Sequence, residues 1–283
     1  MTLLKNSNHM KKNSSPSLAE LLKRQTDRLK AAGISTARLD CLVIFEDTLS
    51  INRAEILARP DFRPSQPKIK QIELRVARRE NNEPLAYIRG KAYFYGREFL
   101  VNHHTLVPRP ETETMIDVIK KIPLPDDAKI ADIGCGSGCI GITLALELEG
   151  CQIDLIDIDK QCLKMARLNS RVLGVKTHSY LQDLLNNNYS DYDLIAANLP
   201  YVPAEHIINE SAMFEPKHAI FAGKDGLDLY RRLFDNTAKH NHPPSYIITE
   251  SLPPQHQQLA SIAKKYGYKL SLTDDFIQLF VKT

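Results

Sequence analysis

Four consecutive residues in the second half of the chain, Asn198-Leu199-Pro200-Tyr201, carry groups that could act on a planar nitrogen. The lone pair of an amide or adenine nitrogen is delocalised, so a site can activate the nitrogen by accepting both of its N–H hydrogens. The side-chain oxygen of Asn198 and a backbone carbonyl stiffened by Pro200 are suitable acceptors, and Tyr201 offers an aromatic face. The apolar run at residues 192–197 predicts a strand that ends at Asn198. The alternative is an ordinary Asn-X-Pro turn that closes a strand.

A glycine-rich segment earlier in the chain indicates the second reactant. Gly134-Cys135-Gly136-Ser137-Gly138 lies between residues 129–133, a predicted strand, and residues 139–148, a predicted apolar helix. Its glycines let the backbone bend and approach a ligand at the end of the strand. A dinucleotide fingerprint would have its third glycine at position 139, which is Cys139. This form, preceded by Asp132, is associated instead with S-adenosylmethionine, whose ammonium group Asp132 could engage; an ordinary strand-to-helix turn is the alternative.

An acidic residue after the next strand is placed to contact the same ligand. Residues 152–156 predict a second buried strand, and Asp157 stands at its end. At this distance from the glycines an acidic side chain can accept hydrogen bonds from ribose hydroxyls. Alternatively, Asp157 caps the helix predicted at residues 160–173, a role that Asp159 could fill equally well.

Asp183 is a further candidate contact for the cofactor. It follows the strand-like residues 177–181 and could accept a hydrogen bond from an adenine amino group, with Leu184 packing on the ring. A solvated loop aspartate is the alternative.

Two more charged residues are candidates for the site. Arg109 lies between two prolines, so its guanidinium is held on a stiff segment and could meet the cofactor carboxylate or the substrate backbone. Pairing with Glu111 or Glu113 is the competing interpretation. Glu250 closes the apolar run at residues 246–249, where it could line the pocket or lie exposed at the sheet edge.

Several segments resemble one known family. The run Leu106-Val107-Pro108-Arg109-Pro110-Glu111-Thr112-Glu113 is the most specific, because S-adenosylmethionine enzymes in general lack it. With it, the chain resembles the PrmC family, also called HemK, of protein glutamine-N5 methyltransferases. The other similar segments are residues 83–90 with Phe94-Tyr95-Gly96 and Phe99, the glycine-rich core, Glu215-Pro216, residues 223–227, and Tyr230-Arg231.

The residues and the resemblance together predict the fold and the reaction. The expected fold is an α/β, Rossmann-like S-adenosylmethionine-dependent methyltransferase sheet, mainly parallel, with an antiparallel C-terminal edge at residues 268–283. The resemblance implies transfer of a methyl group to the side-chain amide nitrogen N5 of the glutamine in the GGQ motif of class 1 peptide chain release factors. The predicted catalytic residues are Asn198, Pro200 and Tyr201. The predicted cofactor-binding residues are Asp132, Gly134, Cys135, Gly136, Ser137, Gly138, Asp157, Asp183, Leu184 and Asn198, and the substrate-binding residues are Arg109, Asn198, Leu199, Pro200 and Tyr201.

One residue departs from the family pattern. The family usually has Asn-Pro-Pro-Tyr, whereas this chain has Leu199 at the second position. The form Asn-Leu-Pro-Tyr also resembles ribosomal-RNA adenine-N6 dimethyltransferases, so an RNA adenine-N6 methyltransferase is an alternative. Others are a glutamine methyltransferase acting on a ribosomal protein and a non-catalytic S-adenosylmethionine-dependent binding factor. We expect position 199 to contribute mainly backbone stiffness.

The predicted domains are a flexible tail at residues 1–15, a helical substrate-recognition domain at 16–83, a β-hairpin linker at 84–107 and the catalytic domain at 108–283. Ser17 and Glu20 form a predicted capping box at the start of the helical domain. A helical candidate at residues 67–80 carries Arg75, Arg78 and Arg79, which predict a solvated face or a binding patch. Recognition of the release factor by this domain is implied by the resemblance alone.

Composition limits the classes of protein to consider. A net charge of +3 is mild for a protein of 283 residues, so stable nucleic-acid binding is not expected. Five cysteines without a CxxC pair indicate reduced thiols, a cytoplasmic protein and no metal site. Neither an 18-residue apolar run nor a signal peptide is apparent, so no membrane association is expected. We expect a monomer.

Overall fold

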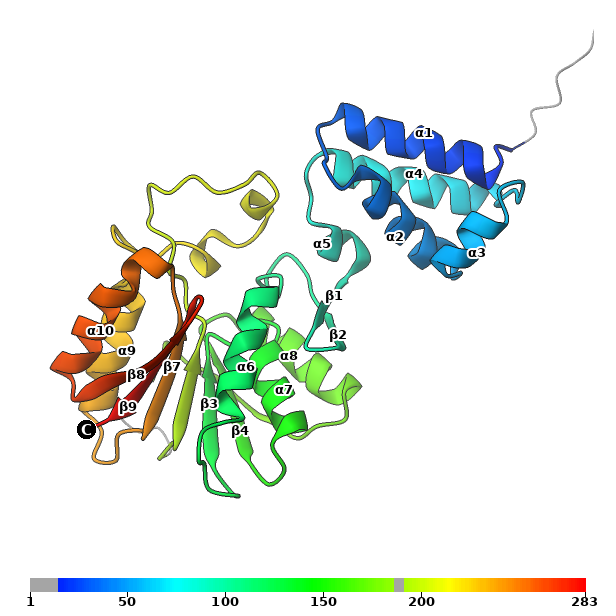
Figure 1. Ribbon diagram of the computed structural model, residues 1–283. Coiled ribbons are helices and arrows are strands. Elements are labelled where there is room, and N and C mark those ends of the chain that lie inside the picture. Colours follow the sequence, from blue (N-terminus) through cyan, green and yellow to red (C-terminus); the bar gives the residue numbers. More distant parts are fainter. Residues whose placement is uncertain (1–14, 186–190) are drawn as a thin grey trace, which may run out of the picture. The chain divides into compact units, whose positions relative to one another are not determined.

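The computed structural model describes residues 15–185 and 191–283. The chain divides between Arg89 and Gly90 into two compact units (Figure 1). The tail predicted at residues 1–15 lies outside the described residues except for Ser15. Among the described residues, no helix combines the length and the apolar character needed to cross a membrane.

The first unit is built from helices. The capping box at Ser17 is confirmed: its hydroxyl accepts from the Glu20 N–H at 3.3 Å, and the Glu20 carboxylate accepts from the Ser17 N–H at 2.7 Å. Leu21, Phe45 and Ile72 are fully buried and join three of the helices in one core. The helices are α1 (Leu18–Ala31), α2 (Ala37–Leu49), α3 (Arg53–Ala58), α4 (Gln66–Glu80) and α5 (Leu85–Arg89).

The arginines of α4 have partners inside this unit. The Nε atom of Arg79 lies 2.7 Å from the Asp40 carboxylate, and both side chains are largely buried. Arg75 donates to the Thr48 hydroxyl at 3.0 Å, and Arg78 pairs with Glu83. Arg75 and Arg79 are thus paired within the helical unit, whereas Arg78 keeps an exposed side chain beside Glu83.

The segment predicted as a hairpin linker is only partly a hairpin. Its first residues form α5, because Pro84 supplies a fixed φ and its carbonyl accepts from the N–H groups of Tyr87 and Ile88. The strands β1 (Lys91–Phe94) and β2 (Arg97–Leu100) follow and pair antiparallel within the second unit. Tyr95 and Gly96 both have positive φ, as a two-residue hairpin turn requires.

The second unit contains a seven-stranded sheet covered by helices. Its strands are β3 (Lys129–Ile133), β4 (Gln152–Asp157), β5 (His178–Leu181), β6 (Leu194–Ala197), β7 (Tyr246–Glu250), β8 (Tyr268–Asp274) and β9 (Ile277–Lys282). Its α-helices are α6 (Glu113–Ile119), α7 (Cys139–Glu147), α8 (Lys160–Val172), α9 (Asp228–Ala238) and α10 (His256–Lys265). Short 3-10 helices are η1 (Pro110–Thr112), η2 (Ala212–Phe214), η3 (Lys217–Ala219) and η4 (Pro253–Gln255).

The strand order is β5-β4-β3-β6-β7-β9-β8, which confirms the predicted methyltransferase-type sheet. The first five strands are parallel, and β9 runs antiparallel to both β7 and β8. One apolar core joins α6, α7 and α8 to one face of the sheet, and a second core joins α9 and α10 to the other (Figure 1). The chain leaves β3 toward β4 on one side and later places β6 on the other side, so ligands are expected at the carboxyl ends of these strands.

Asp132 lies in β3 behind the glycine-rich turn, and its carboxyl group is fully buried. Its Oδ2 accepts from the Gly141 N–H at 2.8 Å, which ties the first turn of α7 to the strand. Its Oδ1 has no hydrogen-bond partner among the described residues. Burial therefore raises the pKa of Asp132 from 3.8 to about 7, although the Gly141 hydrogen bond opposes the shift.

We expect Asp132→Asn to change how stability depends on pH. Between 3.8 and about 7 the folded protein holds the Asp132 proton and the unfolded chain does not. The wild-type free energy of unfolding should therefore fall, relative to that of the variant, by up to about 1.4 kcal/mol per pH unit as the pH rises through this window. Urea unfolding at several pH values in this window measures the difference, with Asp127→Asn, at an exposed carboxyl group, as the control. Parallel pH profiles for wild type and Asp132→Asn would contradict this assignment.

Candidate active site

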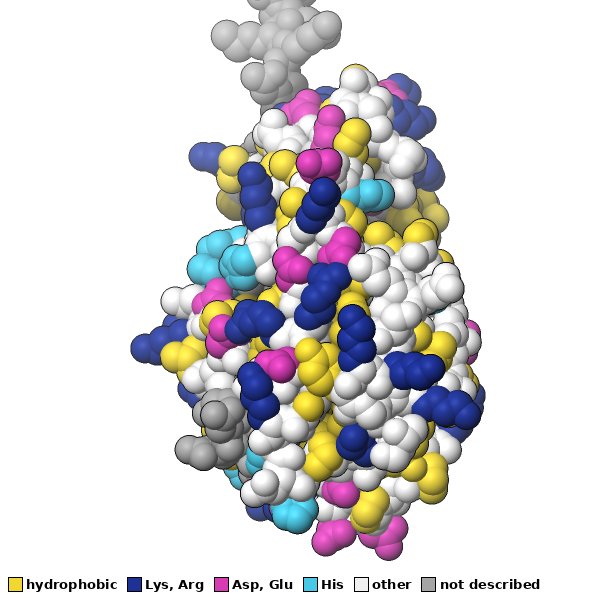
Figure 2. All heavy atoms as spheres, turned by 90° about the vertical axis from the view of Figure 1, so that its left-hand side faces the viewer, with side chains coloured by type: hydrophobic (Ala, Val, Ile, Leu, Met, Phe, Trp, Pro, Cys, Tyr) yellow, Lys and Arg dark blue, Asp and Glu magenta, His cyan; other side chains and the backbone are white. Residues whose placement is uncertain are grey.

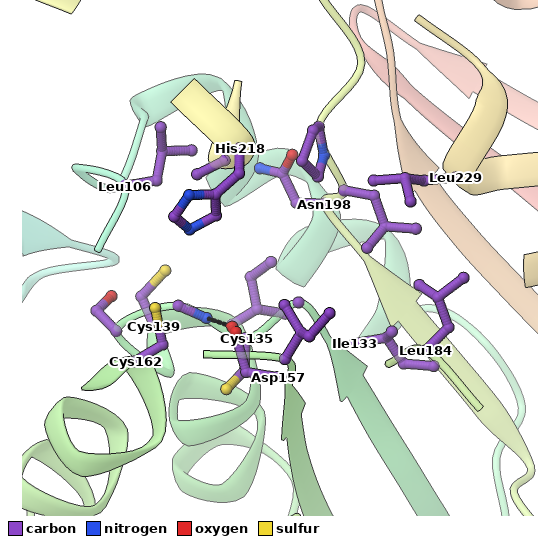
Figure 3. Close-up of a pocket in the computed structure, with 18 of the residues that line it drawn as sticks. Leu106, Ile133, Cys135, Cys139, Asp157, Cys162, Leu184, Asn198, His218 and Leu229 are labelled. Atoms are coloured by element: carbon purple, nitrogen blue, oxygen red, sulfur yellow. Dashed lines mark hydrogen bonds between the residues drawn. The ribbon is translucent and has the colours of Figure 1, made fainter. Parts of the chain in front are cut away.

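A cavity of about 370 Å³ lies at the carboxyl ends of the parallel strands (Figure 3). This volume is within the range of small-molecule sites. Among the predicted site residues, those that line the cavity are Arg109, Gly134, Cys135, Gly136, Ser137, Asp157, Asp183, Leu184, Asn198, Leu199 and Pro200. Asp132, Gly138 and Tyr201 are not among the residues that line it.

The glycine-rich turn forms the floor of the cavity. The N–H groups of Gly134 and Cys135 donate to the Ile156 carbonyl at 2.8 and 3.0 Å, so the turn is held against the end of β4. Gly138 caps α7 with a φ of 80°, and a Cβ there would lie 2.8 Å from Ile142 Cδ1. This glycine therefore shapes the turn by close packing.

Asp157 joins the turn to the end of β4. Its Oδ2 accepts from the Gly136 N–H at 2.9 Å, and its Oδ1 accepts from the Asp159 N–H at 2.8 Å. The cap of α8 is Asp159, which accepts from the Gln161 N–H at 2.7 Å. Burial raises the pKa of Asp157. Each carboxylate oxygen can accept more than one hydrogen bond, so Asp157 retains acceptor capacity on the cavity side.

Asp183 and Leu184 form another part of the wall. The Asp183 carboxylate pairs with Arg232 at 2.7 Å, and both side chains are about half exposed. Leu184 is buried, and its carbonyl accepts from the side chain of Gln182 at 2.8 Å. Ile158 also lines the cavity, although it is 62% exposed, so its side chain offers an apolar surface to a ligand.

Asn198 is tied to two residues on other elements. Its Nδ2 lies 3.1 Å from the Thr112 hydroxyl, and that hydroxyl donates to Glu250 Oε2 at 2.6 Å. The Tyr201 hydroxyl donates to the other Glu250 oxygen at 2.9 Å. Glu250 is 1% exposed, so it lies neither at an open sheet edge nor on the cavity surface but directly behind Asn198. Burial and the neighbouring Glu250 carboxylate raise the pKa of Tyr201, which keeps its hydroxyl protonated.

The segment after the tetrapeptide supports it from behind. The Gln255 side chain donates to both the Tyr201 and Asp225 carbonyls at 2.7 Å. A Cβ on Gly226 would lie 2.0 Å from the Tyr201 carbonyl oxygen, so only glycine permits this approach. The single proton of the Tyr230 hydroxyl is shared between the carbonyls of Ala197 and Glu250. The family-like segments in this part of the chain thus hold the end of β6 in place.

Leu199 packs on the glycine-rich turn. It is 3% exposed, and a Cβ added to Gly134 would lie 3.0 Å from Leu199 Cδ2. The expectation that position 199 mainly stiffens the backbone was therefore incomplete, because its side chain also fills the space between the tetrapeptide and the turn.

The partner of Arg109 is Glu215, not Glu111 or Glu113. An Arg109 Nη atom lies 2.6 Å from Glu215 Oε1, and the Val107 N–H donates to Glu215 Oε2 at 3.0 Å. Glu215 is buried, whereas Arg109 is 37% exposed and lines the cavity. The competing interpretation of Arg109 was right to invoke pairing but wrong about the partner.

Sequence patterns missed several residues of the wall. Thr112 belongs to the family-like segment that contains Arg109, but nothing in its spacing connected it to Asn198. His218 carried no signal; in Figure 3 its imidazole points into the cavity, and it belongs to η3. Its positive charge, when protonated, lowers the pKa of Asp157.

Comparisons with known families cover both units of the chain. The PrmC N-terminal domain family matches residues 20–90, and the methyltransferase small domain family matches residues 111–215. Among solved structures, the hMettl16 catalytic domain bound to a MAT2A 3'UTR hairpin covers 77% of this chain and 82% of its own. Its TM-score of 0.51 at 15% identity shows a shared fold.

Curated relatives specify the family. Release factor glutamine methyltransferase from Koribacter versatilis is 32% identical over 228 residues, which is 78% of this chain and 81% of the relative. The enzyme of that name from Bacillus subtilis is 33% identical, over 77% of this chain and 78% of the relative. The bifunctional methyltransferase of Rickettsia typhi is 30% identical over 90% of this chain, which spans only 54% of that longer protein. The chain therefore belongs to the PrmC family of release factor glutamine methyltransferases.

Proposed function

We propose that this protein transfers a methyl group from S-adenosylmethionine to the side-chain amide nitrogen N5 of the glutamine in the GGQ motif of class 1 peptide chain release factors. The observation that carries the proposal is the position of Asn198. Its amide is held by Thr112 and lines the same cavity as the glycine-rich turn and Asp157. The names of the relatives supply the substrate.

The cavity residues fit S-adenosylmethionine. Gly136 has a φ of 55°, and a Cβ added to it would meet no atom within 4 Å, so the backbone there can approach a ligand closely. Asp157 accepts the ribose hydroxyls, while Leu184 and Ile158 offer apolar contacts to adenine and Asp183 accepts from its amino group. Asp132 does not line the cavity, so it affects the cofactor ammonium only indirectly. Its hydrogen bond to the Gly141 N–H holds α7 and the glycine-rich turn in position. When bound, this cofactor supplies a cationic methyl donor.

The chain's own residues position the nitrogen for attack. Asn198 Oδ1 accepts one hydrogen of the substrate amide, and the carbonyl at Pro200 accepts the other. Tyr201 is not among the residues that line the cavity, and it supports this segment through its hydrogen bond to Glu250. No general base is required, because the donor is already cationic and positioning provides much of the rate. Arg109 binds the substrate backbone at the mouth of the cavity while Glu215 holds it.

The proposal extends to partners and location. The helical unit binds the release factor, the protein acts as a monomer in the cytoplasm, and nucleic acid is not stably bound. On the face seen in Figure 2, Lys and Arg side chains are interspersed with Asp, Glu and apolar side chains, which agrees with the net charge of +3. A stable nucleic-acid site would favour a basic stripe instead.

Asn198→Ala should lower the kcat of methyl transfer by about 100-fold or more, as removal of a single transition-state hydrogen-bonding group does. Affinity for S-adenosylmethionine should stay within several-fold, because the glycine-rich turn and Asp157 are untouched. Single-turnover transfer of a labelled methyl group measures the rate, with Asn241→Ala, at an exposed asparagine, as the control. An unchanged rate would remove Asn198 from the mechanism.

Asp157→Ala should have the opposite effect from Asn198→Ala: it should weaken cofactor binding before it affects the rate of methyl transfer. Loss of hydrogen bonds to a charged group, each worth about 1.5–3 kcal/mol, should weaken S-adenosylmethionine binding by about tenfold to more than 100-fold. Titration calorimetry measures this change. Asp159→Ala is the matched control, because it removes the cap of α8 without removing a cavity acceptor. Undiminished affinity in Asp157→Ala would overturn the assigned role.

The substrate is tested by parallel incubations with methyl-labelled S-adenosylmethionine. The acceptors are a class 1 release factor, the same factor with its GGQ glutamine changed to alanine, a ribosomal-protein mixture and naked ribosomal RNA. We expect label only on the unaltered release factor. Label on the RNA or on a ribosomal protein instead would replace the proposed substrate, and label on the altered factor would exclude the GGQ glutamine as the acceptor.

A further inference from the structure

Thr112 and Glu250 connect Asn198 to two distant parts of the chain. Thr112 ends η1, 86 residues before Asn198, and Glu250 ends β7, 138 residues after Thr112. Thr112 is 2% exposed and Glu250 is 1% exposed. Burying the Glu250 carboxylate is unfavourable unless hydrogen-bond donors surround it, so its donors are expected to be important for the site.

Burial raises the pKa of Glu250, and while its carboxyl group is ionised the hydrogen bonds in this group run in one direction. An ionised carboxylate has acceptors and no donor, so the hydroxyls of Thr112 and Tyr201 must both donate to Glu250. Thr112 has then used its only proton, and its oxygen can only accept from Asn198. The atom of Asn198 that faces Thr112 must therefore be Nδ2, as the structure has it at 3.1 Å. A flipped amide would place two acceptors against each other.

We propose that Thr112 and Glu250 are positioning residues that set the orientation of the Asn198 amide, so that its Oδ1 rather than its Nδ2 faces the substrate nitrogen. This inference rests on the proposed function. The orientation matters because the substrate amide nitrogen carries two hydrogens. A donor facing it would repel those hydrogens, whereas Oδ1 accepts one of them.

The Glu250 carboxylate is held in place by more than one contact. Its other oxygen accepts from Tyr201, the last residue of the tetrapeptide, so the same carboxylate holds both ends of that segment. The single proton of the Tyr230 hydroxyl is shared between the main-chain carbonyls of Glu250 and Ala197. Tyr230 therefore joins the backbone at the ends of β6 and β7, while Thr112 and Tyr201 hold the carboxylate itself.

The first test compares Thr112→Val with Thr112→Ser. Valine keeps the shape and removes the hydroxyl, so kcat should fall by about 100-fold, the size expected when a reacting group is misplaced. The dissociation constant for S-adenosylmethionine should be unchanged, and serine should restore most of the lost rate. Glu250→Gln should also lower kcat, because its amide can donate to Thr112 and reverse the chain of hydrogen bonds. Equal rates in wild type and Thr112→Val would overturn the proposal.

A double-mutant cycle separates positioning from general damage. If Thr112 acts through Asn198, then Thr112→Val should change the residual rate of Asn198→Ala by much less than it changes the wild-type rate. Additive losses in the double variant would mean that Thr112 acts independently of Asn198, which contradicts the proposal. Asn241→Ala in place of Asn198→Ala is the control background, in which the full effect of Thr112→Val should persist.

A measurement made without substrate tests the orientation of the Asn198 amide separately from the proposed methyl transfer. The side-chain NH₂ resonance of Asn198, identified by its loss in Asn198→Ala, should show slow hydrogen exchange in wild type and in Thr112→Ser. In Thr112→Val its exchange should become fast. If wild type fails to methylate the release factor, the proposed function fails while this measurement still tests the orientation. Fast exchange in wild type would overturn the orientation itself.

Discussion

The site depends on buried carboxylates at the carboxyl edge of the parallel sheet. Loops that follow parallel strands bring N–H groups and hydroxyls into a packed interior, where each donor needs an acceptor. Asp157 accepts from Gly136, Glu215 accepts from Val107 and Arg109, and Glu250 accepts from Thr112 and Tyr201. Each of these carboxylates joins segments that are far apart in sequence. Their burial is tolerated because several donors converge on each one.

The glycine-rich turn and the tetrapeptide line the same cavity because of this arrangement. The glycine-rich turn and the tetrapeptide, to which we assign the cofactor and the substrate nitrogen, follow the neighbouring strands β3 and β6. Leu199 fills the space between them and packs over Gly134. A proline here would stiffen the backbone. The leucine lacks that restraint, but its side chain adds an apolar contact with the turn.

Support from the second face of the sheet is equally necessary. The tetrapeptide leaves β6 as irregular backbone, and such backbone holds a fixed shape only where its polar groups are satisfied. Gln255 and Tyr230 provide these contacts, and Gly226 allows a close approach that any side chain would prevent. The family-like residues Gly226 and Tyr230 thus support the backbone of the site.

Local patterns in the sequence were sufficient for the elements and for the residues at their ends. Apolar runs predicted the strands, the antiparallel C-terminal edge and the glycine-rich turn, because strand and helix periods and glycine geometry depend on near neighbours. They also placed Asp157 and Asn198 at strand ends, where the topology brings them to one cavity. The pairing of Arg109 with Glu215 and the connection of Asn198 through Thr112 to Glu250 were decided only by the tertiary structure. These partners are about a hundred or more residues apart along the chain in most cases, and no periodicity connects residues that meet only after the sheet has assembled.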